Sequence, residues 1–152
     1  MAPAAFEHHM QLALAAAEAA AGRGEVPVGA IVVDAVGKVL AVAGNETRAR
    51  NDPTGHAEII AIRDACSALA SERLVDCDLW VTLEPCPMCA AAISFARIRR
   101  LYFGAGDPKG GAVEHGVRLF RQPSCHHAPE VYGGIDEVRS MALLKDFFAA
   151  RR

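Results

Sequence analysis

Apolar residues recur at helical spacing in three stretches of the chain. A spacing of three or four residues places such side chains on one face of a helix. The helices that this spacing predicts cover residues from about Phe6 to Ala21, His56–Leu69 and residues from about Asp136 to Ala150. Their apolar positions include Phe6, Met10, Leu14, Ile59, Ile60, Ile62, Cys66, Leu69, Met141, Leu144 and Phe148. A further helix is predicted at Pro87–Phe95, with Pro87 near its first turn.

Short apolar runs, rich in β-branched residues, predict strands between these helices. The runs cover Val28–Val33, Lys38–Val42, Leu79–Leu83 and Arg100–Phe103. Asp34–Gly37 should form a hairpin turn between the first two, and the glycine-rich segment Gly104–Gly111 should form a loop. Helices that alternate with strands imply crossover connections and helices layered on a sheet. We therefore expect an α/β fold in a single domain over residues 1–152.

Composition is that of a globular protein rather than a disordered one. The chain has 152 residues, of which 52% are hydrophobic and 22% are charged. Its mean hydropathy is +0.16, within the range of ordinary folded domains. The formal net charge of −2 gives no overall sign of a polyanionic partner. Arginines nevertheless cluster at Arg97, Arg99 and Arg100, and such local patches leave binding of a nucleic acid open.

The sequence carries no signal for a membrane or for secretion. No stretch approaches the roughly 20 apolar residues of a transmembrane helix. The N-terminal pattern has neither a basic start nor an uninterrupted apolar run, so it does not resemble a signal peptide. Five cysteines, an odd number, argue against a disulfide framework. We expect a cytoplasmic protein that does not enter a membrane.

Two short segments carry the residues with the clearest chemistry. His56 and Glu58 open one predicted helix, and Cys86 and Cys89 stand three residues apart at the start of another. Zinc prefers thiolate and imidazole ligands, and a catalytic zinc has three protein ligands with its fourth position left to water. The pattern therefore predicts one Zn²⁺ held by His56, Cys86 and Cys89. Glu58 can then reach the water without binding the metal and transfer protons during catalysis.

Each segment taken alone has other interpretations. A C-x-x-C pair also occurs in structural zinc sites and in redox dithiols, and histidine followed by glutamate is common on helix surfaces. Joined in this order, with Pro85 before Cys86, the segments form the H-x-E…P-C-x-x-C signature of zinc-dependent base deaminases. A redox dithiol would leave His56 and Glu58 without a role. Hydrolysis at a zinc site uses all of these residues.

Around this signature the chain resembles the cytidine/deoxycytidylate deaminase superfamily, and within it the bacterial tRNA-specific adenosine deaminases. The similarity extends over nearly the whole chain, and the D-P-T-x-H-A-E and T-L-E-P-C strings with the F-G-A-x-D-x-K loop indicate the tRNA branch. The segments that carry it are Val26–Ala30, Gly44–Asn45, Asp52–Ile59, Val81–Cys86, Cys89–Ala90, Ala96–Ile98, Phe103–Lys109 and Asp146–Phe148.

This resemblance implies a three-layer α/β/α fold with a central mixed five-stranded sheet. It also implies a homodimer with one zinc ion per subunit. The reaction that it implies is hydrolytic deamination of adenosine to inosine at the wobble position, the first position of the tRNA anticodon. Glu58 is then the catalytic residue, and the tRNA anticodon arm is the partner that the substrate residues contact.

The resemblance also assigns substrate contacts to residues outside the zinc motif. Asn45 is expected to hydrogen-bond the flipped-out base, since an amide both donates and accepts hydrogen bonds. Asp107 is expected to contact the nucleotide next to the target base. Asn45 could equally end a strand in a turn, and Asp107 could serve turn chemistry with Pro108. The resemblance further implies that four residues lie near the anticodon arm: Lys109, Phe148, Arg151 and Arg152.

Some positions depart from the family pattern. Gly106, Gly110 and Gly111 predict a flexible substrate loop, and Glu114–Gly133 has only the character of a lid-like stretch. Two rival functions also stand. The same zinc chemistry would serve a free cytosine or guanine deaminase of this fold. A zinc-stabilised tRNA-binding subunit without activity would differ, because it would not need Glu58.

Overall fold

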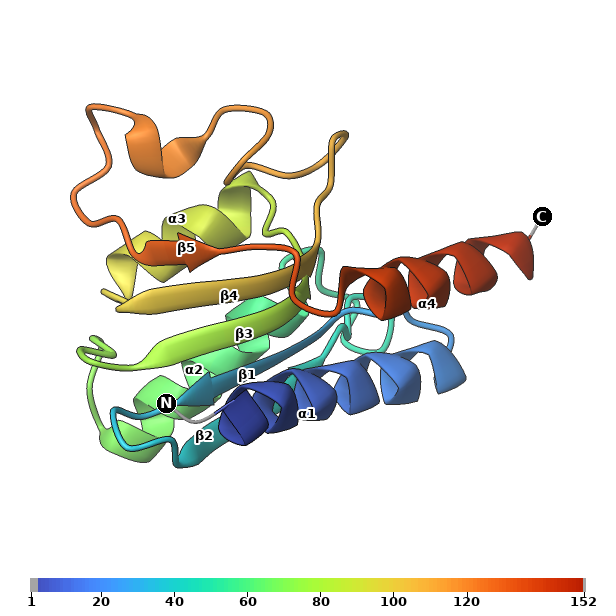
Figure 1. The fold of residues 1–152 in the computed structure, drawn as a ribbon, viewed down its shortest axis with the longest axis horizontal. Helices are drawn as coiled ribbons and strands as arrows, with labels where there is room; N and C mark the ends of the chain where they lie inside the picture. The colour runs from blue at the N-terminus through green and yellow to red at the C-terminus, as the bar shows by residue number, and fades with distance from the viewer. Residues whose placement is uncertain (1–2, 152) are drawn as a thin grey trace.

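A computed structural model describes the backbone of residues 3–151 and the side chains of residues 8–151. Five strands form one mixed sheet with helices on both faces (Figure 1), which confirms the α/β fold. The helices are α1 (Pro3–Gly22), α2 (Ala57–Leu69), α3 (Pro87–Phe95) and α4 (Glu137–Ala149), with a short 3₁₀ helix at Leu119–Arg121. The strands are β1 (Gly29–Val33), β2 (Val39–Gly44), β3 (Asp78–Leu83), β4 (Arg100–Ala105) and β5 (Glu130–Tyr132).

The strands lie in the order β2-β1-β3-β4-β5. The hairpin predicted at Asp34–Gly37 joins β1 to β2, and the Asp34 carboxylate accepts the N–H groups of Val36 and Lys38 within it. β1 also runs antiparallel to β3. β3, β4 and β5 are mutually parallel, and α3 makes the crossover between β3 and β4. Parallel neighbours require such a crossover.

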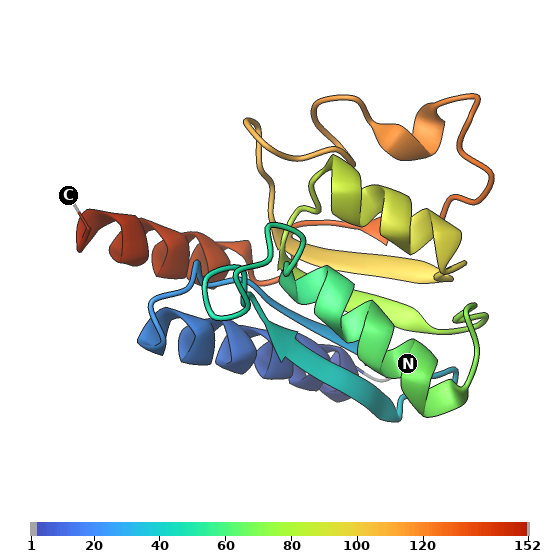
Figure 2. The ribbon, with the colours of Figure 1, turned by 180° about the vertical axis from the view of Figure 1, so that it is seen from behind.

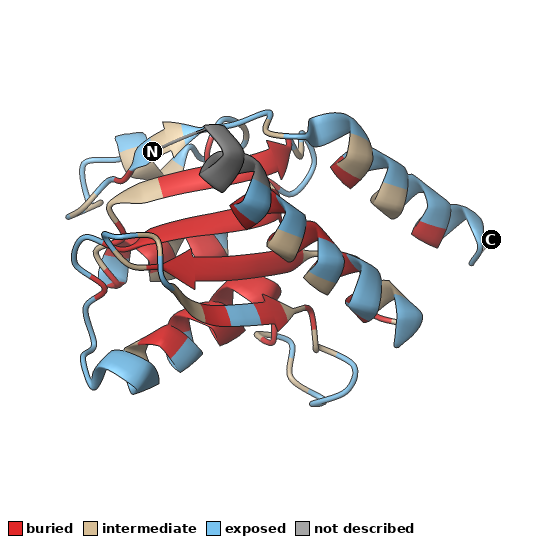
Figure 3. Cartoon of the chain, turned by 60° about the horizontal axis from the view of Figure 1, so that its bottom comes forward, coloured by how far each residue is buried: buried red, intermediate tan, exposed pale blue. Residues whose placement is uncertain are grey.

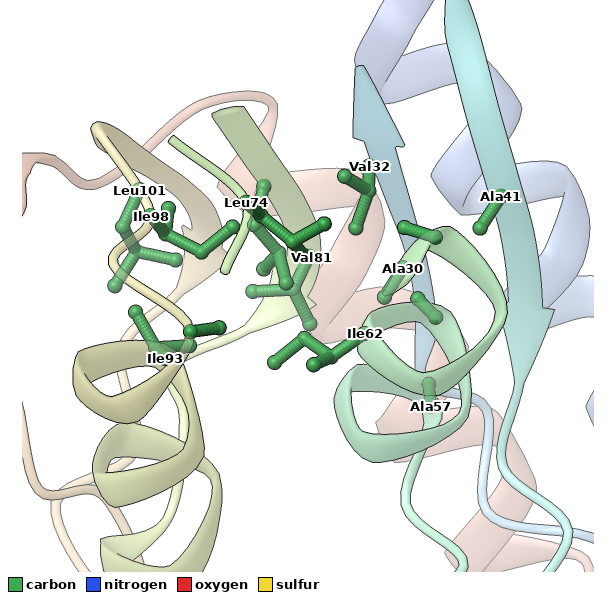
Figure 4. Close-up of a cluster of buried hydrophobic side chains, with 14 of the residues drawn as sticks. Ala30, Val32, Ala41, Ala57, Ile62, Leu74, Val81, Ile93, Ile98 and Leu101 are labelled. Carbon is green, nitrogen blue, oxygen red and sulfur yellow. The ribbon is translucent and has the colours of Figure 1, made fainter. Parts of the chain in front are cut away.

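Both faces of the three central strands, β1, β3 and β4, are buried, as the red strands of Figure 3 show. α2 and α3 lie side by side on the face seen in Figure 2, and the apolar side chains between them and the sheet form the larger core (Figure 4). α1 covers the other face over β1, β2 and β3. It packs so closely there that a Cβ at Gly29 would lie 2.0 Å from the carbonyl oxygen of Ala13, so this contact requires glycine.

Two predictions about local structure were wrong. Gly104 and Ala105 belong to β4 rather than to a loop, because Ala105 pairs with Leu83 and sheet pairing outweighs the low strand propensity of glycine. The stretch Glu114–Gly133 holds β5, which the pattern of residues did not predict; only the family resemblance implied a fifth strand. β5 is an edge strand of three residues, too short for an alternating pattern to be recognised.

The apolar positions of α4 also differ from expectation. α4 runs past the end of the sheet (Figure 1), so much of its apolar side cannot reach the core. Met141 is 57% exposed and Phe148 is 48% exposed, whereas the neighbouring Phe147 is buried. The predicted apolar position Phe6 lies outside the described side chains. Within the described residues, none of the helices has both the length and the apolar character needed to span a membrane.

Candidate active site

The helices α2 and α3 both begin at the same end of the sheet, where β3 finishes (Figure 2). His56 is the residue that precedes the first turn of α2, and Cys86 holds the same position before α3. Pro87 is the first residue of α3, a place where a missing N–H is no loss. This arrangement points two helix N-termini, with their partial positive charge, at one place, and such charge stabilises thiolates.

The turn before His56 fixes the direction in which α2 starts. The Asp52 carboxylate accepts hydrogen bonds from the backbone N–H of Thr54 at 2.9 Å and from the Thr54 hydroxyl at 2.7 Å. These bonds lower the pKa of Asp52. The N–H of Gly55 donates to the Asp52 carbonyl, and Gly55 in turn accepts from Glu46. The turn at residues 51–55 therefore holds His56 against the end of β2.

His56, Cys86 and Cys89 converge in the geometry of a metal site. Nδ1 of His56 lies 3.7 Å from Sγ of Cys86 and 3.5 Å from Sγ of Cys89. In a zinc tetrahedron with bonds of about 2.0 and 2.3 Å, nitrogen and sulfur are about 3.5–3.6 Å apart. Within the described part of the chain this is the one group of three potential ligands whose atoms all lie within 4.8 Å of one another. The residues present therefore fit the predicted ion.

The two thiols of this group differ in how readily they lose a proton. Hydrogen bonds from Cys89 and then from His56 lower the pKa of Cys86 to about 4, although burial opposes them. The pKa of Cys89 is raised, because its hydrogen bond to Cys86 and its burial both favour the thiol. The same contact with Cys86 raises the pKa of His56. Without a metal the three groups share protons, and these are the protons that a bound cation would replace.

Glu58 lies on the first turn of α2 and is only 4% exposed. Burial raises the pKa of its carboxyl group to about 7, even though the charge of His56 opposes this shift. A carboxyl group with a pKa close to neutral can both accept and donate a proton at physiological pH. Glu58 is outside the group of metal ligands but lines the same cavity.

A cavity of about 290 Å³ opens over these residues. His56, Glu58 and Cys86 line it together with the apolar residues Val26, Val28, Ala57 and Leu83. Asn45, 7% exposed, reaches the cavity from the end of β2. Its backbone N–H donates to Val28, while its side-chain amide makes no hydrogen bond to any described residue. An amide held in this way can pair with the edge of a planar ligand.

The other predicted substrate residues lie at different distances from this cavity. Asp107 lines it, and also lines a neighbouring groove of about 440 Å³ whose far side is formed by Met141, Leu144 and Phe148 of α4. Lys109 is exposed on the same loop and lines neither space. Arg151 stacks over the ring of Phe147 at 3.5 Å and donates to its carbonyl. Arg152 lies outside the described residues.

Sequence reasoning missed two buried acids that hold the rim of the cavity. The Glu25 carboxylate accepts the N–H groups of Arg48 and Ala49. Glu84 lines the cavity and binds the loop of Asp107 through its carboxylate. Burial opposes ionisation of Glu84, but the N–H of Asp107 and the His115 ring outweigh it and lower its pKa. Glu84 is part of the T-L-E-P-C string. The position of this acid between an apolar strand and a proline was the signal that could have assigned it a role.

Comparisons with known proteins agree with this geometry. The MafB19-like deaminase family matches residues 5–152. A tRNA-specific adenosine deaminase of Agrobacterium fabrum is 62% identical over 145 residues, which are 95% of each chain. A solved structure from a study of A-to-I editing by tRNA:A34 deaminases at the wobble position of transfer RNA has a TM-score of 0.89 and 63% identity. That match covers 91% of this chain and 99% of the other.

A guanine deaminase of Bacillus subtilis is more distant. Its structure is 32% identical with a TM-score of 0.65, over 95% of this chain and 92% of the other. The higher identity and the closer fold both lie with the tRNA-specific enzymes. These matches show that the chain belongs to the MafB19-like deaminase family, in the branch that holds the tRNA-specific adenosine deaminases.

Proposed function

We propose that this enzyme deaminates adenosine at the first anticodon position of tRNA. Water adds to C6 of the adenine ring, the bond from C6 to the exocyclic amine breaks, and inosine and ammonia are the products. The observation that carries the proposal is one cavity that joins three potential metal ligands, a buried acid and an amide. The identity of 62% to a tRNA-specific adenosine deaminase supports the choice of substrate.

The proposal includes one zinc ion on His56, Cys86 and Cys89, whose distances suit a tetrahedral ion. Zinc bound there supplies a Lewis acid that lets water react at neutral pH. Glu58 accepts a proton from the attacking water and donates it to the ring nitrogen. It then takes the remaining proton of the added hydroxyl group and donates it to the departing amine. Its pKa of about 7 suits both tasks, since a single group must be basic and acidic in turn.

In this proposal the base enters the cavity by flipping out of the anticodon loop. The amide of Asn45 pairs with it, and the apolar walls at Val26, Val28 and Leu83 cover its faces. The groove beside Asp107 then receives a neighbouring nucleotide against Phe148, whose exposed ring offers a stacking surface. Lys109, exposed on the same loop, faces the phosphate backbone.

We further propose that the enzyme is a homodimer joined through the surface around Phe95. Phe95 is 73% exposed at the end of α3, beside a groove lined by Glu72, Arg73 and Arg97. Aromatic and arginine side chains are enriched at protein interfaces. A patch with both signs of charge can also match its own copy across a twofold axis. The molar mass in solution tests this: a dimer has twice the 16.1 kDa of one chain.

A cytoplasmic location completes the proposal. All five cysteines are free thiols in the structure. Thiols that ligate a metal persist in a reducing compartment, whereas secreted proteins tend to form disulfides. The proposed substrate, tRNA, is in the same compartment.

The decisive test is to incubate the purified, zinc-replete enzyme with tRNA and to measure inosine at the first anticodon position. Adenosine, cytosine and guanine are assayed in parallel for release of ammonia. Inosine in tRNA with no ammonia from the small compounds is the expected result. Ammonia from guanine or cytosine with unaltered tRNA would overturn the proposed substrate and leave the deaminase chemistry standing.

Replacing Asn45 by alanine should weaken binding of the base and leave the metal in place. The amide reaches the cavity but lies outside the ligand group, so its loss removes one or two hydrogen bonds to the base. We expect kcat/KM to fall by about twofold to a hundredfold, since each bond contributes about 0.5–1.5 kcal/mol. Steady-state kinetics and zinc content measure this, and unchanged kinetics would remove Asn45 from the substrate site.

A further inference from the structure

Glu84 is a buried acid at the end of a strand in the middle of the sheet. It follows the last residue of β3 and precedes Pro85, and its side chain has no exposed surface. A buried carboxylate is strongly unfavourable unless hydrogen bonds compensate it. The chemistry proposed above gives Glu84 no part, because it is neither in the ligand group nor the proton carrier. Its partners therefore indicate what it does.

All of these partners belong to one loop. The Oε2 atom of Glu84 accepts the backbone N–H groups of three consecutive residues, Val113, Glu114 and His115, at 3.0, 2.9 and 3.1 Å. The Oε1 atom accepts the N–H of Asp107 at 2.9 Å and contacts Nδ1 of His115 at 2.6 Å. One carboxylate thus binds both ends of the segment 107–115.

The loop is shaped to bring its backbone onto this carboxylate. A Cβ at Gly111 would lie 2.5 Å from the carboxyl carbon of Glu84, so only glycine permits the approach. Asp107 continues the network, because its own carboxylate accepts the N–H groups of Lys109 and Gly110. The glycines from which we predicted a flexible loop instead allow the loop backbone to approach Glu84 and to be held by its carboxylate.

The pinned segment is the part of the rim that faces the substrate. Asp107 and Gly110 line the cavity, and Asp107 also lines the adjoining groove. We propose that Glu84 is a positioning residue for the RNA substrate: it holds Asp107 and its loop at the mouth of the cavity without touching the base. The proposal rests on the proposed function only in taking Asp107 as a contact to RNA.

Glu84→Gln tests the proposal with little change in volume. Glutamine replaces one acceptor oxygen by an NH₂ donor. The less costly orientation keeps the oxygen on the three consecutive N–H groups, so the N–H of Asp107 loses its acceptor. Hydrogen exchange at the Asp107 amide should then accelerate on the order of tenfold. With an anticodon stem-loop RNA as substrate, KM should rise on the order of tenfold while kcat and zinc content stay near wild type.

Two further variants separate positioning from general stability. Asp78→Asn removes a buried carboxylate from the start of the same strand, where Arg99 binds it through two hydrogen bonds. It should lower the free energy of unfolding and leave KM unchanged. Gly111→Ala pushes the loop away from Glu84 without altering the buried charge. It should raise KM as Glu84→Gln does, and it provides the test if that variant does not fold.

The results separate the two proposals. Unchanged KM and unchanged exchange at Asp107 in both loop variants would overturn the positioning role, as would an equal rise of KM in Asp78→Asn. A wild-type enzyme without activity on the stem-loop would overturn the proposed substrate instead. In that case the exchange measurement still tests whether Glu84 holds Asp107.

Discussion

Glu58→Gln is expected to remove turnover while one zinc ion per chain stays bound. Glutamine fills the same buried space but can neither take a proton from water nor return it to the leaving amine. Glu58 lies outside the group formed by His56, Cys86 and Cys89, so the metal site should remain intact. We expect kcat to fall by about 10²–10⁴-fold, the usual contribution of general acid–base catalysis. Single-turnover kinetics and zinc analysis of the same sample measure both quantities.

Asp64→Asn is the matched control, since Asp64 is an exposed acid on the same helix. It should retain wild-type kcat. Full activity of Glu58→Gln would contradict the proposed mechanism. Full binding of tRNA by a wild-type protein without turnover would favour the other interpretation, a zinc-stabilised RNA-binding subunit.

His56→Ala should remove the metal and the activity together. His56 contributes the one nitrogen of the site, at 3.7 and 3.5 Å from the two sulfurs. Loss of a supporting residue next to a metal already lowers affinity 10–100-fold, so loss of a ligand should lower it by at least about 100-fold. The wild-type melting temperature should rise with added zinc, because an ion that binds only the folded state stabilises it. His56→Ala should lose this dependence.

His126→Ala serves as the control because His126 is exposed and outside the group of potential ligands. It should keep full zinc content and the zinc-dependent melting temperature. If His56→Ala also kept one zinc ion per chain, the assignment of His56 as a zinc ligand would be wrong. Atomic absorption on protein dialysed against metal-free buffer distinguishes the two outcomes.

Much of the fold follows from local patterns. The periodicity of α2 and the runs of β1 to β4 are strong signals, because each buries one or two apolar faces, and Pro87 marks the start of α3. The spacing from Cys86 to Cys89 was equally informative, and the structure brings both sulfurs to His56. Such predictions succeed where the partner of a residue is implied by its own segment or by a well-defined ligand geometry.

The remaining features depend on contacts between distant segments. β5 is fixed by pairing with β4 rather than by its own three residues. The exposure of Phe148 follows from where α4 projects, which its amphipathic pattern does not encode. The role of Glu84 depends on N–H groups 23 to 31 residues away. Hydrogen bonds from a backbone leave no residue-specific signal in the sequence.

The proposed metal ligands lie at the starts of α2 and α3, and their separation along the chain constrains the order in which the chain folds. His56 and Cys86 are 30 residues apart, and β3, which lies between them in sequence, must insert between β1 and β4. We therefore expect the three proposed ligands to meet only after this non-local pairing has formed. A metal ion bound by all three would then report that the sheet is complete.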